Sequence, residues 1–495
     1  MSQAAAAPEP VPPSGGPGPA AEHDSDDAAT SVVSMYVKQK KIYARAVTGW
    51  FAGWRWAFVW ATQLVFYGLP WLQWNDRQAV LFDLGARRFY IFGMVLYPQD
   101  FIYLTALLII SAYSLFLFTA VAGRLWCGFA CPQTVYTEIF MWVERKVQGD
   151  RMARMKRDAG PWNFDRLWRA AAKQAAWIAI ALWTGFTFVG YFTPIHTLAQ
   201  LVSQFALGPW EAFWVFFYGF ATYGNAGFMR EQVCKYMCPY ARFQSAMFDK
   251  DTLIVSYDPE RGEPRGSRSR KADRKAIGKG DCIDCGLCVQ VCPTGIDIRK
   301  GLQYECISCT ACIDVCDGVM DKMGYPRGLI RFDTQNGMAQ HLTPAQRLRR
   351  VMRPRVLVYT GILVLLLGAL SASIALRSPF RVDVVRDRAS LARIVDDGQI
   401  ENLYRLQIMN ATEQPQRYQV TVKGLPGMAL DVGGAIEVLP AQARWLTAAV
   451  RIPPQAGSEA GAGAHPIEFE IQRLPHQPGD SVVRTVEKST FVIPR

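Results

Sequence analysis

The stretch CIDCGLCVQVCPTGIDIRKGLQYECISCTACIDVC, residues 282–316, decides the fold at the centre of this chain. Its first half has the spacing C-x2-C-x2-C-x3-C-P, and its second half repeats the same cysteine spacing. A loop with two-residue gaps can wrap three thiolates around one cubane cluster, and the fourth thiolate then comes from the other half of the motif. The stretch therefore predicts two [4Fe–4S] clusters in one compact unit.

We assign the cysteines to the two clusters by this crossed pattern. One cluster takes Cys282, Cys285, Cys288 and Cys316, and the other takes Cys292, Cys306, Cys309 and Cys312. Structural zinc is the alternative, but zinc needs four ligands and usually shows two separated C-x2-C pairs. Pro293 follows its cysteine as the pattern requires, whereas Asp317 stands at the equivalent position in the second half. We expect the core of this domain at residues 275–325.

Two clusters imply one-electron transfer, because neither stores a hydride and the sequence has no G-x-G-x-x-G motif for a dinucleotide. Electrons must therefore arrive from a separate donor. The basic run RGEPRGSRSRKADRKAIGK, residues 261–279, is suited to attract an acidic carrier such as a flavodoxin or a ferredoxin. The plainer interpretation is a solvated loop that obeys the positive-inside rule.

The rest of the composition is typical of a membrane protein, because 50% of the residues are hydrophobic and 12% are aromatic. Several apolar runs are long enough to cross a hydrocarbon layer of roughly 30 Å. They are residues 56–74, 101–123, 174–192, 212–229 and 356–376. Buried core helices are the alternative, but the flanking Trp and Tyr residues favour membrane spans.

Lysine and arginine set the expected orientation. They cluster in KQKKIYAR (38–45), in the loop after the second run and in residues 230–355, and they are absent from 193–208. This pattern places the N-terminus and the cluster domain in the cytoplasm and the C-terminus outside; Arg87 and Arg88 are exceptions. The net charge of +12 then reflects membrane orientation, and we expect no nucleic acid partner. Twelve cysteines without a secreted-domain pattern also indicate a reducing compartment.

The sequence predicts a multidomain membrane protein with an α-helical transmembrane region, a bacterial-type two-[4Fe–4S] ferredoxin domain and a C-terminal immunoglobulin-like β-sandwich. Alternation such as Tyr418-Val420-Val422, with turn signals such as QAGSEAGAGAH, predicts that sandwich, which we expect to be a docking module. The expected divisions are a disordered tail at 1–35, four spans within 36–229, a cytoplasmic loop with the ferredoxin domain at 230–355, a fifth span at 356–376 and the periplasmic sandwich at 377–495.

Two further motifs, WCGFACPQ (126–133) and VCKYMCPY (233–240), follow the second and fourth runs. Their cysteines are Cys127, Cys131, Cys234 and Cys238. Thiols at i and i+4 share one helical face, and Pro132 and Pro239 suit the first position of a following helix. Soft thiolates select Cu(I), zinc or iron–sulfur clusters, so we take these cysteines as candidate metal ligands, with inert buried thiols as the alternative. Met237 is a possible thioether ligand or a packing residue.

Together these runs, the two C-x3-C-P motifs, the doubled cluster motif and the C-terminal β domain resemble the cytochrome c oxidase accessory protein family, CcoG, also called FixG or RdxA. The resemblance covers nearly the whole chain after residue 35. The C-x3-C-P pair is shared with membrane electron-transfer proteins of the NapH and NosR types. The fifth run and the C-terminal domain separate this chain from those relatives.

The resemblance implies an inner-membrane cupric reductase that helps to assemble the copper centre of a haem–copper cytochrome c oxidase. It implies two [4Fe–4S] clusters as cofactors, copper as the substrate, and the four C-x3-C-P cysteines as catalytic groups that bind or reduce copper. Oxidase subunits or copper chaperones are the implied partners. Two other hypotheses stay open: a membrane relay that carries electrons from quinol to a reductase, and a non-enzymatic scaffold for oxidase assembly.

Overall fold

The computed structural model describes residues 41–494 except 271–276, 389–391, 396–397 and 476–481. The expected tail at 1–35 and part of the basic run at 261–279 lie outside the described residues. From Ile42 onward the chain forms one compact unit.

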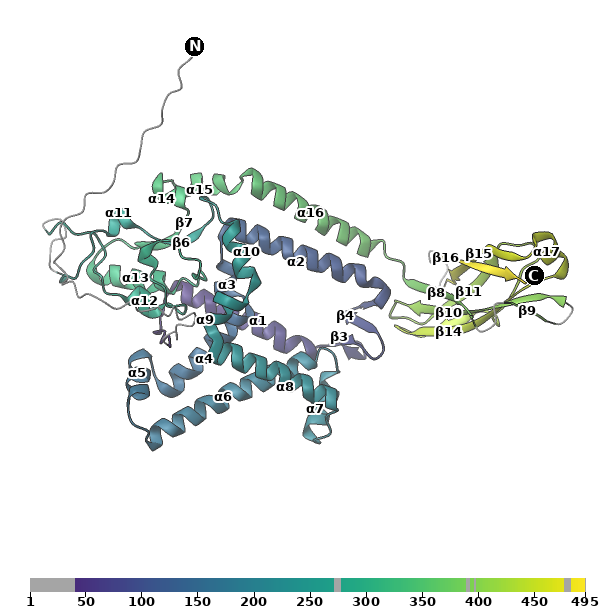
Figure 1. Cartoon of the computed structure of the whole chain (residues 1–495), viewed down its shortest axis with the longest axis horizontal. Coiled ribbons are helices and arrows are strands. Elements are labelled where there is room, and N and C mark those ends of the chain that lie inside the picture. The colour runs from purple at the N-terminus through teal and green to yellow at the C-terminus, as the bar shows by residue number, and fades with distance from the viewer. Residues whose placement is uncertain (1–40, 271–276, 389–391, 396–397, 476–481, 495) are drawn as a thin grey trace, which may run out of the picture. The chain divides into compact units, whose positions relative to one another are not determined.

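Long helices make up much of the first 230 residues and return once before the C-terminal domain (Figure 1). The long helices are α1 (Trp50–Gly68), α2 (Phe101–Ala122), α4 (Pro132–Gln148), α6 (Phe164–Val189), α8 (Pro209–Gly224) and α16 (Pro354–Ala375). Shorter helices are α3 (Leu125–Phe129), α5 (Arg151–Ala159), α7 (Ile195–Ser203), α9 (Arg230–Gln232), α10 (Pro239–Met247), α11 (Pro259–Gly262), α14 (Gln335–Ala339) and α15 (Pro344–Val351). Short strands join α1 to α2: β1 (Gln73–Trp74), β2 (Arg77–Gln78), β3 (Val80–Asp83), β4 (Arg88–Ile91) and β5 (Met94–Leu96).

Two helical segments, Pro98–Ala122 and Pro354–Ala375, are long and apolar enough to cross a membrane, within the part of the chain that is described. The sequence predicts five, so this expectation is met only in part. The other three expected spans fall on α1, α6 and α8. The helix α1 includes Arg55, and α6 carries arginine and lysine in its first half. The fourth expected span is a 16-residue helix, α8, because the π-helical turn Asn225–Met229 interrupts it.

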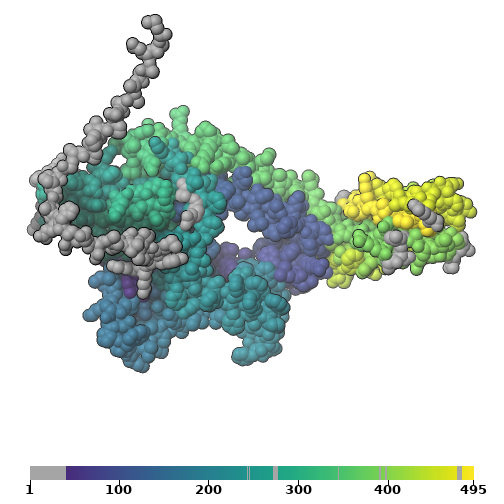
Figure 2. All heavy atoms as spheres, viewed as in Figure 1, coloured from purple at the N-terminus to yellow at the C-terminus, as the bar shows by residue number. Residues whose placement is uncertain are grey.

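The two apolar helices α2 and α16 lie side by side (Figure 1), and Tyr103 of α2 donates a hydrogen bond to the Ser373 carbonyl of α16 at 3.3 Å. Their apolar side chains are largely exposed, for example Ile102, Leu108 and Leu365. An opening borders the residues of α2 in the space-filling view of Figure 2. Exposed apolar surface of this extent suits contact with lipid rather than with water, which indicates a membrane protein.

The cysteine-rich centre folds as two similar halves. Each half is a cysteine loop followed by a helix, α12 (Leu287–Val291) in the first and α13 (Ala311–Met323) in the second. The antiparallel pair β6 (Ile254–Tyr257) and β7 (Ile330–Asp333) closes the domain. Its core includes Val255, Ile298, Met320 and Leu329, all at most 3% exposed.

The carboxylate of Asp314, on α13, ties this domain to α1. It accepts hydrogen bonds from the backbone N–H groups of Phe51 at 3.1 Å and Ala52 at 2.7 Å, in the first turn of α1. An anion at a helix N-terminus satisfies unpaired donors and meets the positive end of the helix dipole. A Cβ on Gly49 would lie 2.3 Å from the Asp314 Cγ, so this approach requires glycine. The helix α1 therefore starts at Trp50, six residues before the expected span.

The C-terminal region is a two-sheet β-sandwich, as predicted. One sheet contains β12 (Ala429–Asp431), β14 (Ala443–Ile452), β10 (Ile400–Asn410), β8 (Phe380–Arg386) and β9 (Arg393–Ile394), and the other contains β13 (Ile436–Val438), β11 (Gln416–Lys423), β15 (Gly463–Arg473) and β16 (Arg484–Ile493). The predicted alternation is confirmed, because Tyr418 and Val420 of β11 are buried in the shared core. The stretch read as a loop, QAGSEAGAGAH, instead contains the helix α17 (Pro454–Ala460), which Pro454 begins at its first position.

Replacing Asp314 with alanine should destabilise the chain by about 1–2 kcal/mol, because two N–H groups of α1 lose their acceptor. Thermal unfolding of the protein in detergent measures the change. The control is Asp321→Ala on the same helix, whose side chain is 47% exposed and, among the described residues, pairs with Arg327. Equal losses in the two variants would contradict the capping role of Asp314.

Candidate metal centres

The first group of predicted ligands surrounds one cavity. Cys282, Cys285, Cys288 and Cys316 line a space of about 370 Å³, which we call the Cys316 cavity. Its other walls are mostly apolar, and Cys285 is exposed while Cys282 is buried. The loop of the first half thus supplies three thiols, and α13 of the second half supplies the fourth.

The second group surrounds a neighbouring cavity in the same way. Cys292, Cys306, Cys309 and Cys312 line a space of about 350 Å³, the Cys292 cavity, which Cys288 also touches. Isoleucine side chains form much of the remaining wall. The structure therefore brings the eight cysteines together in the two crossed sets that the spacing predicts.

The two cysteine loops have the same backbone design. Each carries two residues with positive φ, Asp284 and Gly286 in the first loop and Ser308 and Thr310 in the second. Residues with positive φ reverse the direction of the chain within a short distance, so that consecutive cysteines converge on one point. Backbone N–H groups also approach the sulfurs, as Ser308 N–H does for Cys306. Such donors stabilise sulfur that carries negative charge.

The thiols fit an iron–sulfur core by their charge balance as well as by their placement. Burial raises the pKa of the Cys306 and Cys316 thiols to about 12, so as thiolates they need a cation beside them. In the described part of the chain, no three His, Cys, Asp or Glu side chains are close enough to hold a single metal ion. A cubane is larger than one ion, so its ligands stand further apart, as these cysteines do.

The four C-x3-C-P cysteines lie at breaks between helices. Cys127 is on α3, which ends at Phe129, and Cys131 has an extended backbone and caps α4. Cys234 lies in the π-helical turn Val233–Met237, and Cys238 caps α10. The proline positions were predicted correctly, but the shared helical face was wrong, because each motif leaves the helix before its second cysteine.

The two motifs meet, and their thiols form one group. Cys131 and Cys234 lie near enough to Cys127 to raise the pKa of its thiol, and Cys238 does the same for Cys131. Burial raises the pKa of the Cys127 thiol to about 12 and that of Cys234 to about 11. Cys127 Sγ also lies 3.5 Å from Oε1 of the buried Gln244. Met237 is 56% exposed and so lies at the edge of this group.

This thiol group packs directly against the Cys292 cavity. Cys127 and Cys234 belong to the same apolar cluster as Cys309 and Cys312. Gly128, between the two cysteines of the first motif, is so close to the second cysteine loop that a Cβ there would lie 2.8 Å from Cys309 N. The Lys235 ammonium donates a hydrogen bond to the Thr294 carbonyl at 3.1 Å. Both motifs are therefore held on the loops that form the Cys292 cavity.

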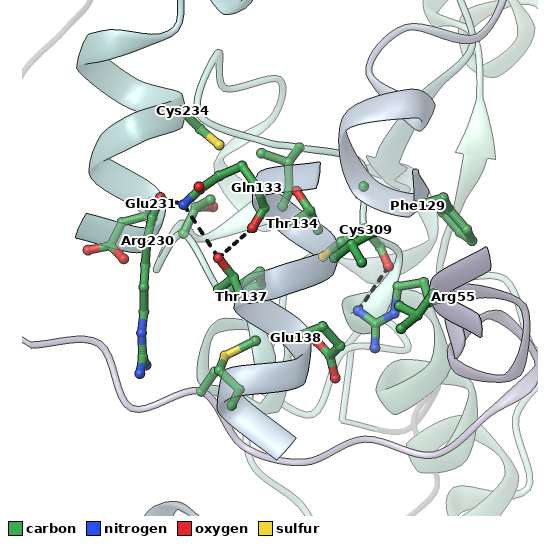
Figure 3. Close-up of a pocket in the computed structure, with 18 of the residues that line it drawn as sticks. Arg55, Phe129, Gln133, Thr134, Thr137, Glu138, Arg230, Glu231, Cys234 and Cys309 are labelled. Atoms are coloured by element: carbon green, nitrogen blue, oxygen red, sulfur yellow. Dashed lines mark hydrogen bonds between the residues drawn. The ribbon is translucent and has the colours of Figure 1, made fainter. Parts of the chain in front are cut away.

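A further cavity lies between the thiol motifs and this loop, and Cys234 and Cys309 both line it (Figure 3). The Gln133 side chain donates to the carbonyls of Asn225 at 3.0 Å and Arg230 at 3.1 Å, at the start and just past the end of the π-helical turn Asn225–Met229. The sequence interpretation missed Gln133 and also Arg55, whose guanidinium reaches the Cys309 carbonyl at 3.3 Å. The only signal for Arg55 was a single charge within an aromatic run.

Comparisons with known families agree with this arrangement. A family model described as a 4Fe-4S dicluster domain matches residues 229–335, and one described as an IG-like fold at the C-terminal of FixG matches residues 370–494. A third, described as a 4Fe-4S binding domain, matches residues 104–148, whose cysteines are Cys127 and Cys131. Iron–sulfur clusters as cofactors and the immunoglobulin-like domain are thereby confirmed.

Full-length relatives are similar over most of their length. "Nitrogen fixation protein FixG" of Rhizobium meliloti is 37% identical over 81% of this chain and 82% of its own. "Protein RdxA" of Cereibacter sphaeroides is 39% identical over 87% of this chain and 92% of its own. Among solved structures, a FixG-related protein from Vibrio parahaemolyticus matches 23% of this chain and 97% of its own, at 25% identity and a TM-score of 0.20. The chain belongs to the FixG family, as an iron–sulfur protein of electron transfer in the membrane.

Proposed function

We propose that this protein reduces Cu(II) to Cu(I) for the assembly of a haem–copper cytochrome c oxidase. The eight cysteines from Cys282 to Cys316 hold the two clusters in the sets described above. Thiols of the C-x3-C-P motifs supply the copper ligands as pairs, because no three of them are close enough in the described structure to hold one ion together. Each bound cluster supplies one-electron chemistry, and the chain supplies the path and the copper ligands.

The observation that carries this proposal is the contact between the thiol motifs and the Cys292 cavity. Gly128 lies against the backbone of Cys309, and Cys127 and Cys234 pack with two ligands of that cavity. An electron that reaches Cys309 is then in the same packed cluster as Cys127 and Cys234, two of the proposed copper ligands. Thiolates also favour Cu(I) over harder ions, so the reduced form is the one these groups hold best.

The electron balance is one electron for each copper ion. Cu(II) gains one electron and becomes Cu(I), and a one-electron carrier protein is oxidised by the same amount. The exposed Cys285 marks the Cys316 cavity as the side where such a carrier, a flavodoxin or ferredoxin type with an acidic surface, docks. Basic residues of 261–270 lie beside that cavity, for example Arg268, whose guanidinium reaches the Cys282 carbonyl at 3.5 Å.

The proposal includes five membrane crossings, with the N-terminus and the ferredoxin domain in the cytoplasm and the C-terminal sandwich in the periplasm. The exposed aromatic side chains of α1 and α8, such as Trp60 and Phe220, support spans in addition to α2 and α16. Oxidase subunits or copper chaperones receive the copper, and the sandwich docks on one of them.

A second candidate function is an electron relay without copper. It is favoured by the match of residues 104–148 to a 4Fe-4S binding domain, because the cysteines in that segment belong to the first C-x3-C-P motif. In this function the four thiols hold a third cluster and pass electrons to another reductase.

Copper reduction is tested with chemically reduced protein, Cu(II) and a dye that binds Cu(I). We expect the wild type to form Cu(I), and we expect most of that activity to be lost in Cys127→Ser/Cys131→Ser and in Cys234→Ser/Cys238→Ser. Met237→Leu, an exposed position in the same motif, is the matched control and should keep the wild-type rate. If both cysteine variants reduce copper at the wild-type rate, the thiols are not the copper site.

Iron content distinguishes the two candidate functions. Two cubanes require about eight irons per chain, and this number should be unchanged when the C-x3-C-P cysteines become serine. About twelve irons in the wild type, with about four lost in those variants, would support the relay with a third cluster. Fewer than about six irons would contradict the assignment of two cubanes.

The Gly128→Ala variant tests the close contact. A Cβ would lie 2.7 Å from the Ile307 carbonyl oxygen, so the thiol motif must move away from the cysteine loop. We expect the oxidation of reduced protein by Cu(II), followed by visible absorbance in a stopped-flow instrument, to become several-fold slower at unchanged iron content. Gly318→Ala in α13 is the control, because its Cβ meets no atom within 4 Å. If Gly128→Ala is oxidised by Cu(II) at the wild-type rate, this contact does not determine the electron path.

A further inference from the structure

Two deeply buried arginines lie beside the Cys292 cavity without a carboxylate partner. Arg55 is 8% exposed and Arg124 is 4% exposed. Neither makes an ion pair with any residue that the structure describes, whereas the equally buried Arg154 pairs with Glu144 at 2.7 Å. Glu138, which lines the further cavity of Figure 3 together with Arg55, pairs with Arg145 at 3.1 Å instead. A buried charge without a counter-charge is costly, so a negative group is needed nearby.

Both guanidiniums are fixed on the loops that carry the ligands of this cavity. Arg55 donates to the Cys309 carbonyl at 3.3 Å (Figure 3). Arg124 donates to the carbonyl of Tyr304, two residues before Cys306, and to the carbonyl of Ala241 after the second thiol motif. Asp314 fixes the first turn of α1 on α13, and Arg55 lies one turn further along the same helix.

The Cys316 cavity has a different charge environment. Its arginine, Arg299, pairs with Asp297 at 2.8 Å and also with Asp284. Asp317 directly follows its remote ligand Cys316. A further arginine near this cavity, Arg268, is partly exposed, so water and salt screen its charge. Among the described residues, the arginine that lines the Cys316 cavity pairs with carboxylates, whereas Arg55 and Arg124 beside the Cys292 cavity make no ion pair.

We propose that Arg55 and Arg124 are positioning residues that hold the reduction potential of the Cys292-side cluster above that of the Cys316-side cluster. A cubane with four thiolates is anionic and becomes more so on reduction, and its potential depends on net charge and burial. Burial alone lowers the potential of the inner cluster, and two uncompensated positive charges in a medium of low dielectric constant reverse that order.

This order gives the electron flow its direction. Electrons received on the side of the exposed Cys285 move downhill toward Cys309 and the C-x3-C-P thiols. The inference rests on the proposed electron path but not on copper as its end point. It holds equally if the acceptor is another reductase.

The test is a redox titration of the full-length protein in detergent, followed by electron paramagnetic resonance, on samples with equal iron content. The signal whose shape changes in Cys306→Ser identifies the inner cluster, which should be the one reduced at the higher potential. In Arg55→Gln and Arg124→Gln the reduced-to-oxidised ratio of this cluster at a fixed potential should fall about tenfold, a shift of about 59 mV for one electron. The other cluster should be unchanged.

Two further variants separate charge from packing. Arg55→Lys keeps the charge and should retain most of the wild-type potential. Arg353→Gln removes an arginine that is also largely buried but pairs with Asp249 at 3.0 Å and donates to the carbonyls of Ala120 and Asp251 rather than to a cysteine loop, so it should shift neither cluster. The inference is overturned if the outer cluster has the higher potential in the wild type. It is also overturned if Arg55→Gln and Arg124→Gln shift both clusters equally or shift neither. If the redox titration gives the expected order of potentials but the protein does not reduce copper, the proposed copper substrate is wrong and the present inference still stands.

Discussion

The crossed exchange of cysteines is the constraint on which the rest of the central domain depends. Each cavity takes three thiols from its own loop and one from the helix region of the other half, Cys316 in one case and Cys292 in the other. Neither half can complete a cavity alone, so the two loops and the helices α12 and α13 must fold together. The positive-φ residues of the two loops allow this convergence, and the buried thiols make a bound cationic core part of the stable structure.

Two close contacts help to attach the membrane helices to this domain. Asp314 caps the first turn of α1, and Gly128 brings the first C-x3-C-P motif against the Cys309 loop. Both contacts need glycine, at Gly49 and Gly128, because any side chain there would overlap its neighbour. As a result, Arg55 of α1 and the four sulfurs of the two thiol motifs lie on one side of the domain.

The second thiol motif is held in an unusual backbone. Two π-helical turns, Asn225–Met229 and Val233–Met237, flank Arg230, which has a φ of 33°. π-helical turns and positive φ at a non-glycine residue both carry an energetic cost and occur often at functional sites. Gln133 of the first motif offsets part of that cost by donating to two carbonyls of this region. The two motifs therefore stabilise one another's geometry, which favours a shared function for their cysteines.

The sequence by itself determined the iron–sulfur chemistry, the two sets of cysteines that line the two cavities, the β-sandwich and the proline-led helices after each C-x3-C-P motif. These features depend on local spacing, because a two-residue gap, a strict alternation or a proline acts over a few residues. The spans were less certain from sequence, since Arg55 and the π-helical turns alter α1 and α8. Only the tertiary structure decided that the thiol motifs lie on the Cys292 side, that Asp314 caps α1, and that Arg55 and Arg124 face that side without carboxylate partners among the described residues. Such contacts join positions more than 50 residues apart, and no local pattern in one sequence records them.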